Sequence, residues 1–395
     1  MSIKLSTRVQ AVKPSPTLAI TARANEMRAA GKDVIGLGAG EPDFDTPAHI
    51  KEAAIKAIND GFTKYTAVDG TPSLKKAIIE KFRRDNQFEY TPEQILVSCG
   101  GKQSFYNLAQ AILDPGDEVV IPVPYWVSYP DMAILAGGVP VYIHAGSDQH
   151  FKITPAQLEA AITDKTRLVV INSPSNPTGM AYSAEELTAL GEVLLEHPKI
   201  VVATDDMYEH IRWTGKPFVN ILNVCPELDN RCMVLNGVSK AYSMTGWRIG
   251  YAGGPANIIK AMKKIQSQST SNPTSIAQVA AQAALEGPQD CIAEMLGHFK
   301  QRHDYMVDRL NKIPGVSCLP ADGTFYTFPS VQEAINKLDG INNDLELAEY
   351  LIEHAGVALV PGTAFGLAGH VRISIATSME NLTNALDRIE KVLNQ

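Results

Sequence analysis

The stretch Val234-Leu-Asn-Gly-Val-Ser-Lys240-Ala-Tyr-Ser-Met-Thr-Gly-Trp-Arg248-Ile-Gly-Tyr251 organises the rest of the chain. The apolar run at 233–235 predicts a short buried strand that ends in a turn of small residues. Lys240 follows this turn, where open α/β sheets place their ligands. Arg248 comes next, between glycines that allow a close backbone approach. Lysine forms Schiff bases with aldehydes, and arginine binds phosphate groups. Lys240 and Arg248 together therefore predict a site for a cofactor that has both an aldehyde and a phosphate, such as pyridoxal phosphate.

The composition indicates an ordinary globular protein of about two domains, because a single core stops growing beyond roughly 300 residues. A net charge of −8 argues against a nucleic-acid-binding surface. No apolar run has the length of a membrane span, and no secretory signal is recognisable. Five cysteines without C-x-x-C spacing argue against a disulfide framework or a zinc site. We therefore expect a cytoplasmic protein without a metal centre.

Short apolar runs alternate with helical patterns from residue 94 onward, which is typical of a parallel sheet. Three successive strand–helix units place Asn176, then Asp205 with Tyr208, then Lys240 just past the ends of expected strands. An isolated lysine is most often a solvated surface residue. Three residues in succession that suit one cofactor favour a common site instead. The expected strands of this region are 94–98, 118–121, 139–143, 167–171, 200–203 and 233–235. Before this region we expect a strand at 33–37 and a helix at 74–85.

Two glycine-rich segments are candidates for anion binding. Cys99-Gly100-Gly101-Lys102 lies between an expected strand and an expected helix, where free N–H groups form a cradle for phosphate. Gly36-Leu-Gly38-Ala-Gly40 resembles a dinucleotide fingerprint. However, Glu41 stands where the third glycine belongs, and Pro42 stands where a helix should open. A glycine-lined substrate loop is the preferred interpretation of this second segment.

The sheet pattern fades after residue 253. Helices are expected at 275–286 and 344–354 and a strand at 357–360, and the last part of the chain is typical of an α+β unit. Arg372 lies there in an apolar strand, where a buried cation requires an anionic partner. The predicted fold class is α/β, a three-layer, mostly parallel sheet with a smaller α+β domain built from both termini. The expected boundaries are 48–289 for the large cofactor-binding domain, and 1–47 with 290–395 for the small domain.

In combination, the motifs of this chain resemble those of the pyridoxal-phosphate-dependent aminotransferases of fold type I, in the bacterial aspartate aminotransferase branch. The resemblance covers essentially the whole chain. The motifs that carry it are Gly40-Glu-Pro-Asp-Phe44, Tyr65-Thr-Ala-Val-Asp-Gly70, Gly100-Gly-Lys-Gln103, Pro124-Tyr-Trp126, Asn176-Pro-Thr-Gly179, Asp205-Asp-Met-Tyr208, Ser239-Lys240, Met244-Thr-Gly-Trp-Arg248 and Arg372-Ile-Ser374.

The resemblance implies which residues hold pyridoxal phosphate. Lys240 would carry the cofactor covalently and move the proton during the reaction, while Asp205 would pair with the ring nitrogen. Tyr65 is expected to come from the neighbouring subunit, so the active unit would be a homodimer. Gly237 stands where many members carry serine, so one phosphate contact is lost. The other expected cofactor contacts are Gly100, Gly101, Lys102, Trp126, Asn176, Tyr208, Ser239 and Arg248.

The resemblance also implies how the substrate is held. Arg372 would clamp the α-carboxylate, and Lys102 would reach the distal carboxylate of an acidic substrate with the help of Lys13. A second interpretation also stays open, in which Lys102 is an ordinary residue at the start of a helix and has no functional role. A positive charge is unfavourable at the N-terminal end of a helix, so a lysine at this position favours a role in substrate binding. The other expected substrate contacts are Gly40, Trp126 and Asn176.

The implied activity is transamination by a ping-pong mechanism, in which aspartate and 2-oxoglutarate become oxaloacetate and glutamate. The expected partners are therefore small amino acids and 2-oxoacids, without nucleic acid or membrane. Prephenate, aromatic amino acids or kynurenine are alternative substrates on the same scaffold, and prephenate also presents two carboxylates. A non-catalytic regulator would need a DNA-binding extension or a lost lysine. A dehydrogenase would differ in the absorbance of its bound cofactor.

Overall fold

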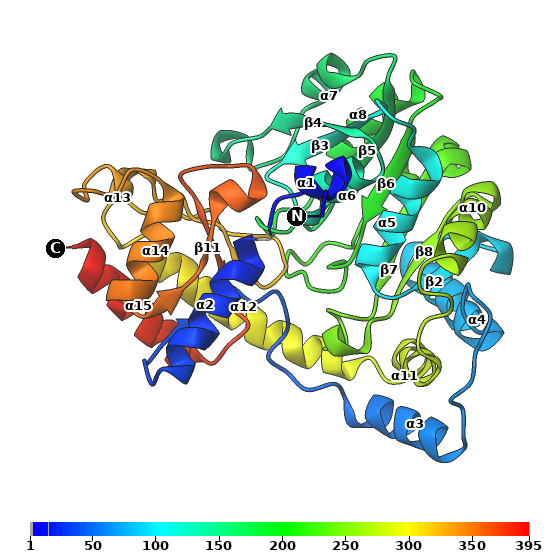
Figure 1. The fold of residues 1–395 in the computed structure, drawn as a ribbon, viewed down its shortest axis with the longest axis horizontal. Helices are drawn as coiled ribbons and strands as arrows, with labels where there is room; N and C mark the ends of the chain where they lie inside the picture. Colours follow the sequence, from blue (N-terminus) through cyan, green and yellow to red (C-terminus); the bar gives the residue numbers. More distant parts are fainter. Residues whose placement is uncertain (1–2, 15, 395) are drawn as a thin grey trace.

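The computed structural model describes residues 3–14 and 16–394, and its largest element is a seven-stranded sheet (Figure 1). The strand order is β2-β8-β7-β6-β5-β3-β4, and only β8 runs against its neighbours. The expectation of a mostly parallel sheet is therefore confirmed. The strands are β2 (Ile95–Ser98), β3 (Glu118–Val123), β4 (Val139–His144), β5 (Thr166–Asn172), β6 (Val201–Asp205), β7 (Cys232–Gly237) and β8 (Gly250–Gly253).

Helices cover both faces of this sheet, which gives the three layers expected from the sequence. Strands that are covered on both faces read as continuous apolar runs, and β2 and β7 are buried along their whole length. One face packs against α5 (Gly101–Ile112), α6 (Ser128–Leu135) and α10 (Ala256–Ser267). The other face packs against α3 (Ala48–Asn59), α4 (Pro72–Lys81), α7 (Pro155–Ala161), α8 (Ala184–Leu195), α9 (Ile221–Val224) and α11 (Ser275–Glu286).

A second hydrophobic core lies in the part of the molecule that contains the C-terminal residues. Strand β1 (Ile35–Gly36), near the start of the chain, pairs in parallel with β10 (Val357–Ala358), near its end. A three-stranded antiparallel sheet is formed by β11 (Val360–Pro361), β12 (Val371–Ser374) and β9 (Tyr326–Thr327). The helices of this part are α2 (Pro16–Ala29), α12 (Asp290–Leu310), α13 (Gln332–Ile335), α14 (Asp344–His354) and α15 (Met379–Leu393), and α12 runs through the middle of Figure 1 in yellow.

Several expected elements are changed in the structure. The expected strand at 33–37 shrinks to the two residues of β1, and the strand at 357–360 is divided between β10 and β11. The helix expected at 74–85 ends at residue 81 and continues as a single π-helical segment, Phe82–Asn86. Helix α6 was not predicted. The short 3₁₀ turns are Pro92–Gln94, Ser147–Gln149, Pro226–Arg231, Thr245–Trp247 and Gly362–Phe365.

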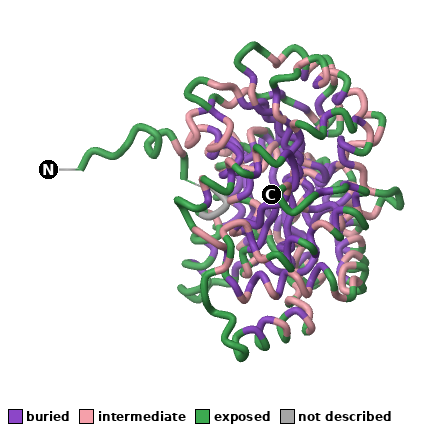
Figure 2. Tube along the Cα trace, turned by 90° about the vertical axis from the view of Figure 1, so that its right-hand side faces the viewer, coloured by how far each residue is buried: buried purple, intermediate pink, exposed green. Residues whose placement is uncertain are grey.

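The N-terminal segment with α1 (Thr7–Ala11) has no buried residue and stands out from the body of the molecule (Figure 2). Its main neighbour is α6, on the face that carries the cavity described below. Among the helices of residues 3–14 and 16–394, none has the length and apolar character needed to cross a membrane.

Candidate active site

A cavity of about 730 Å³ opens where the parallel strands end. Because β2 points the same way as β3 to β7, the segments that follow all these strands meet at one edge of the sheet. Most of the residues predicted for the site line this cavity. They are Lys13, Gly40, Gly101, Lys102, Trp126, Asn176, Asp205, Tyr208, Ser239, Lys240, Arg248 and Arg372.

Two of the predicted residues do not line the cavity. Gly100 lies directly before Gly101, and packs under the guanidinium group of Arg248. Tyr65 is 92% exposed and lies outside the cavity of its own chain.

Lys240 projects from the turn after β7 into the cavity. Its Nζ donates a hydrogen bond to the carbonyl oxygen of Gly40 at 2.6 Å. Burial lowers the pKa of Lys240 to about 8, and the positive charges of Arg372 and Arg248 act in the same direction. A large fraction of this amine is therefore neutral in mildly alkaline solution, which is the form that reacts with an aldehyde.

Asp205 is the last residue of β6, and its carboxylate accepts two hydrogen bonds from the protein. The hydroxyl of Tyr129 donates to Oδ2 at 2.5 Å, and the N–H of Met207 donates to Oδ1 at 3.3 Å. Burial raises the pKa of Asp205, whereas these two bonds and the charge of Lys240 lower it. The carboxylate is thus held in a fixed orientation at the floor of the cavity.

The start of helix α5 and Arg248 form a candidate anion site. The first N–H groups of a helix have no acceptor inside it, and they carry the positive end of the helix dipole. Gly100 precedes this helix with φ +87°, and a Cβ there would collide with the guanidinium group of Arg248. Arg248 itself has φ +54°, and its Nη1 donates to the carbonyl of Thr245 at 2.8 Å. Ser239 adds a buried hydroxyl to the same part of the cavity.

Arg372 is buried, with 3% exposure, between the rings of Tyr326 and Phe365 at 4.3 and 4.9 Å from their centroids. Its Nη1 donates to Oδ1 of Asn176 at 2.9 Å and its Nη2 to the carbonyl of Gly38 at 2.8 Å. Within residues 3–14 and 16–394 its Nε has no hydrogen-bond partner, and no carboxylate forms an ion pair with it. A buried cation bound only to neutral oxygens is suited to receive a carboxylate ligand.

Asn176 links Arg372 to the floor of the cavity. Because Oδ1 of Asn176 accepts from Arg372, its amide nitrogen faces the remaining side as a donor. The N–H of Asn176 donates to Oδ1 of Asn172 at 2.8 Å, and Nδ2 of Asn172 donates to the carbonyl of Asp205 at 2.9 Å. On the other side, the hydroxyls of Tyr208 and Tyr326 lie 3.0 Å apart.

The mouth of the cavity carries two lysines, Lys102 and Lys13. Nζ of Lys102 lies 5.4 Å from the centroid of a ring of Trp126, which is cation–π geometry. Desolvation and the charge of Arg248 lower the pKa of Lys102, while Asp131 raises it. Lys13 lies on the exposed N-terminal segment at the same mouth.

Sequence reasoning missed three residues that shape the site. Tyr129 and Asn172 hold the segment around Asp205, and Tyr326 covers Arg372 and contacts Tyr208. Tyr326 stands in the aromatic run 325–328, which looks like ordinary core in the sequence. Tyr129 belongs to the unpredicted helix α6. Asn172 ends a β-branched strand, as Asp205 does, and this position was a usable signal.

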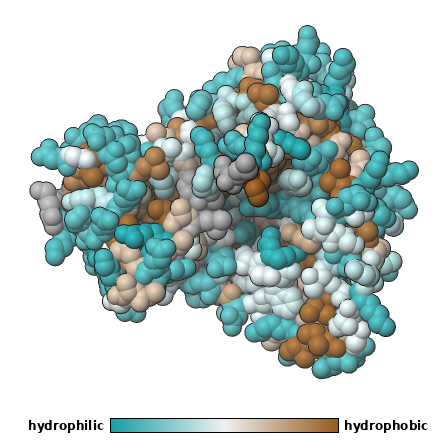
Figure 3. Space-filling view, viewed as in Figure 1, coloured by the Kyte–Doolittle hydropathy of each residue, from teal (hydrophilic) through white to brown (hydrophobic). Residues whose placement is uncertain are grey.

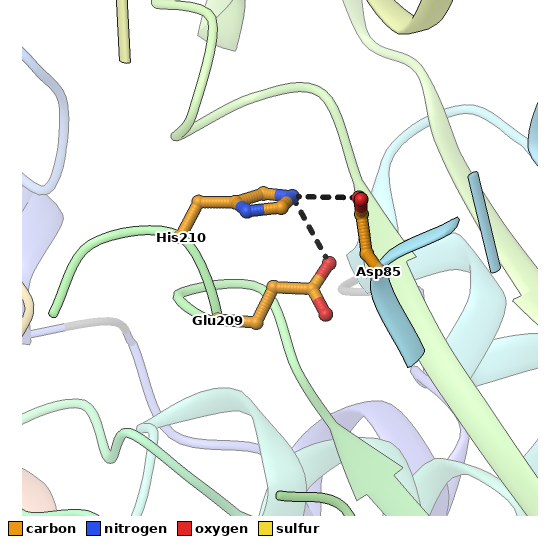
Figure 4. Close-up of side chains that lie close together, drawn as sticks. All are labelled: Asp85, Glu209 and His210. Atoms are coloured by element: carbon orange, nitrogen blue, oxygen red, sulfur yellow. Dashed lines mark ion pairs between the residues drawn. The ribbon is translucent and has the colours of Figure 1, made fainter. Parts of the chain in front are cut away.

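A second cluster of titratable groups lies outside the cavity, where Asp85, Glu209 and His210 approach one another (Figure 4). Three carboxylate and imidazole groups at such distances could hold a metal ion. Here Lys81 forms an ion pair with Glu209, and Asn236 donates to the same carboxylate at 2.7 Å. An ammonium group therefore already neutralises the buried charge. The cluster connects the segment after β6 to β7, and so supports the two segments that carry Tyr208 and Lys240.

A buried lysine with a lowered pKa, a buried carboxylate and a candidate anion site therefore line one cavity at the carboxyl edge of an α/β sheet, where enzymes of this architecture bind their ligands. The sequence profile of the family "Aminotransferase class I and II" matches residues 32–389. The chain belongs to this family of aminotransferases, which use pyridoxal phosphate, and the predicted family is confirmed.

The chain is similar over its full length to several characterised members of the family. It is 60% identical to the aspartate/prephenate aminotransferase of Nitrosomonas europaea, over 99% of this chain and 100% of that protein. It is 54% identical to the aspartate aminotransferase of Geobacillus stearothermophilus, over 99% of both chains.

Solved structures give the same result. The aspartate aminotransferase of Rhizobium meliloti superimposes with a TM-score of 0.96 at 50% identity, over 100% of this chain and 99% of that one. The aspartate aminotransferase of Thermus thermophilus with maleate superimposes with a TM-score of 0.93 at 44% identity, over 99% of this chain and 100% of that one.

Proposed function

We propose that this chain is a pyridoxal-phosphate-dependent aspartate aminotransferase that uses 2-oxoglutarate as amino acceptor. The observation that carries the proposal is the meeting of Lys240, Asp205 and Arg372 in one cavity. A lysine with a lowered pKa suits attachment to an aldehyde, and the buried arginine suits an α-carboxylate.

The residues present fit pyridoxal phosphate. The cradle at the start of α5, with Arg248 and Ser239, suits the phosphate, and Trp126 offers an aromatic face for the ring. Asp205 suits the ring nitrogen, while Tyr208 and the amide nitrogen of Asn176 suit the 3′ oxygen. When bound, the cofactor supplies an aldehyde that accepts the amino group and a ring that stabilises negative charge on the substrate Cα.

Side chains of the protein bind the substrate and move the proton. Arg372 binds the α-carboxylate in a bidentate manner and so orients the Cα–H bond of the substrate. The neutral Nζ of Lys240 would act as general base and take the proton from the substrate Cα, and its protonated form would then act as general acid. The buried carboxylate of Asp205 would pair with the ring nitrogen and keep it protonated. Because the first product would leave before the second substrate binds, double-reciprocal plots are expected to be parallel.

The substrate assignment rests on charge at the cavity mouth and on the relatives. Lys102 and Lys13 place positive charge where the distal carboxylate of aspartate would lie. The Thermus thermophilus relative was solved with maleate, which is a four-carbon dicarboxylate. A second candidate activity is prephenate transamination, because the relative from Nitrosomonas europaea is an aspartate/prephenate aminotransferase.

We propose a homodimer in which Tyr65 completes the phosphate site of the neighbouring chain. Tyr65 is almost fully exposed, and the preceding helix α3 presents Ile55 and Ile58 to solvent, with Phe62 just beyond it. Figure 3 shows a brown patch at the lower end of the molecule, where α3 lies in the same view in Figure 1. An exposed apolar patch beside a functional side chain is typical of a subunit interface.

We also propose that residues 48–289 act as the cofactor-binding domain, and that residues 1–47 with 290–395 act as the small domain. The parallel pairing of β1 with β10 supports this division, because it joins the two ends of the chain. All five cysteines are unpaired, which suits the reducing cytoplasm.

Borohydride reduction of the cofactor-loaded protein, followed by peptide mapping, tests the proposal. We expect the label on Lys240, and we expect Lys240→Ala to lose at least about a thousandfold in turnover, because both the attachment and the proton transfer depend on this amine. Rates with aspartate, prephenate and phenylalanine then identify the substrate. A colourless protein after saturation with pyridoxal phosphate would contradict the proposal.

A further inference from the structure

Tyr129 is a buried tyrosine in the first turn of α6, and the proposed mechanism does not use it. Its side chain is 1% exposed. Its hydroxyl donates to Oδ2 of Asp205 at 2.5 Å, which is the short length typical of a hydrogen bond to a charged carboxylate. Burial and the charge of Asp205 raise the pKa of Tyr129 well above its ordinary value, so the hydroxyl keeps its proton and remains a donor.

The ring of Tyr129 is held between two aromatic neighbours. It meets Trp126 edge-to-face, with centroids 5.2 Å apart and an angle of 85°, and it meets Phe105 of α5 at 4.9 Å. These contacts leave the ring little rotational freedom, so the hydroxyl is aimed at Asp205 before any ligand arrives. One side chain therefore touches both the carboxylate and the indole that the proposed function assigns to the cofactor ring.

We propose that Tyr129 is a positioning residue for the cofactor, which orients and charges Asp205 for its contact with the ring nitrogen. The inference rests on the proposed function. Tyr129 and the N–H of Met207 engage one oxygen each of the Asp205 carboxylate, and so fix its plane. Without the hydroxyl, Oδ2 would lose this donor while the burial remained, so the carboxylate would become more basic and less well oriented.

Equilibrium dialysis of the cofactor-free protein tests this role without measuring activity. We expect Tyr129→Phe to bind pyridoxal phosphate about tenfold more weakly than the unchanged protein, since a hydrogen bond to a charged group is lost. The second ligand is the 1-deaza analogue, which has carbon in place of the ring nitrogen. Tyr129→Phe should bind this analogue as tightly as the unchanged protein does, because Asp205 then has no ring N–H to meet.

Tyr182→Phe is the matched control. Tyr182 lies beside the same small internal space as Tyr129, and its hydroxyl accepts from the N–H of Ile153 at 3.0 Å. This substitution removes a hydroxyl of the same kind without touching Asp205, and it should leave the affinity for both ligands unchanged.

The outcomes separate the two proposals. Equal affinity of Tyr129→Phe and the unchanged protein for pyridoxal phosphate, or an equal loss for both ligands, would overturn the positioning role. Failure of the unchanged protein to bind pyridoxal phosphate would overturn the proposed function instead. If Tyr129→Phe does not fold, Tyr129→Met also removes the hydroxyl, with a flexible apolar side chain in its place. Its loss of affinity should again be confined to the ligand with the ring nitrogen, and an equal loss for both would overturn the role.

Discussion

Single residues in this cavity obtain their chemistry from burial and from neighbouring charge. Lys240 is made less basic because it is removed from water and faces Arg372 and Arg248. Arg372 lies between two aromatic rings, and its hydrogen-bond partners are neutral oxygens. Among residues 3–14 and 16–394, no carboxylate forms an ion pair with Arg372, and a substrate carboxylate would supply one.

The pKa of Lys240 leads to a prediction about stability. In the folded, cofactor-free chain this pKa is about 8, whereas the ordinary value is 10.5. Between these values the unfolded chain binds the proton and the folded chain does not, so stability rises with pH across this window. Lys240→Met should therefore be more stable than the unchanged protein at pH 7.5, by about 2 kcal/mol, and the difference should shrink by pH 10.

Urea unfolding of both cofactor-free proteins at several pH values measures this difference. Lys264→Met, at an exposed position of α10, is the control and should show no such pH dependence. A difference for Lys240→Met that stays constant from pH 7.5 to pH 10 would contradict the lowered pKa.

A second prediction at this scale concerns Lys102. Lys102→Ala should raise the KM for aspartate about tenfold, because it removes a charge-assisted contact to the distal carboxylate. The KM for phenylalanine, which has no distal carboxylate, should change little. Steady-state kinetics with both donors measures the two KM values. An equal increase of KM for aspartate and for phenylalanine would show that Lys102 does not determine substrate specificity. Lys264→Ala should change neither KM.

At the scale of elements, the turn before α5 does more than connect a strand to a helix. Gly100 needs a positive φ, and it also leaves the space into which Arg248 folds. Strand β8 contributes to the same packing, because a Cβ on its Gly250 would collide with the backbone of Gly101. Small residues at these two places therefore let the helix start, the arginine and the reversed strand approach closely.

The substitution Gly100→Ala tests this packing, and Gly116→Ala is its control. Both glycines have a positive φ, but a Cβ at Gly116 would meet nothing within 4 Å. Gly116→Ala should cost about 1 kcal/mol of stability through backbone strain alone. Gly100→Ala should show this cost and should also weaken the binding of pyridoxal phosphate by about tenfold or more, because Arg248 is displaced. Thermal unfolding and equilibrium dialysis measure the two effects. Equal cofactor affinity in both variants would show that the space beside Arg248 is unimportant.

Most elements were predictable from the sequence, and the exceptions have physical causes. Helix α14 and helix α11 lie where the periodicity predicted them. Helix α6 has a proline, Pro130, in its first turn and little amphipathic character, so its pattern does not distinguish it from a loop. Strands β1 and β9 have only two residues each, because tertiary pairing, and not local propensity, defines them.

At the scale of the whole molecule, the proposed shared site makes a prediction about mixed dimers. Tyr65→Ala should weaken cofactor binding, and Lys240→Ala should be inactive. In a dimer of one chain of each kind, the site with the intact lysine receives Tyr65 from the other chain. Random reassociation of equal amounts should therefore restore about a quarter of the wild-type activity, because half of the dimers carry one intact site of two.

The mixture is prepared by unfolding and refolding the two variants together, and each variant refolded alone is the control. Activity of the mixture equal to the average of the two controls would contradict a site shared between subunits. Gel filtration of the unchanged protein checks the dimer independently.

The sequence by itself determined the fold class, the family and most of the residues around the cavity. Apolar runs of strand length and the motifs after them are local, and therefore readable before folding. The role of each site residue stays a prediction until the experiments above are done. Only the tertiary structure decided that Tyr129 reaches Asp205, that Asn176 turns its oxygen to Arg372, and that Lys240 is buried beside two arginines. These contacts join residues far apart in the chain, and hydrogen-bond direction and desolvation exist only once such residues are packed together.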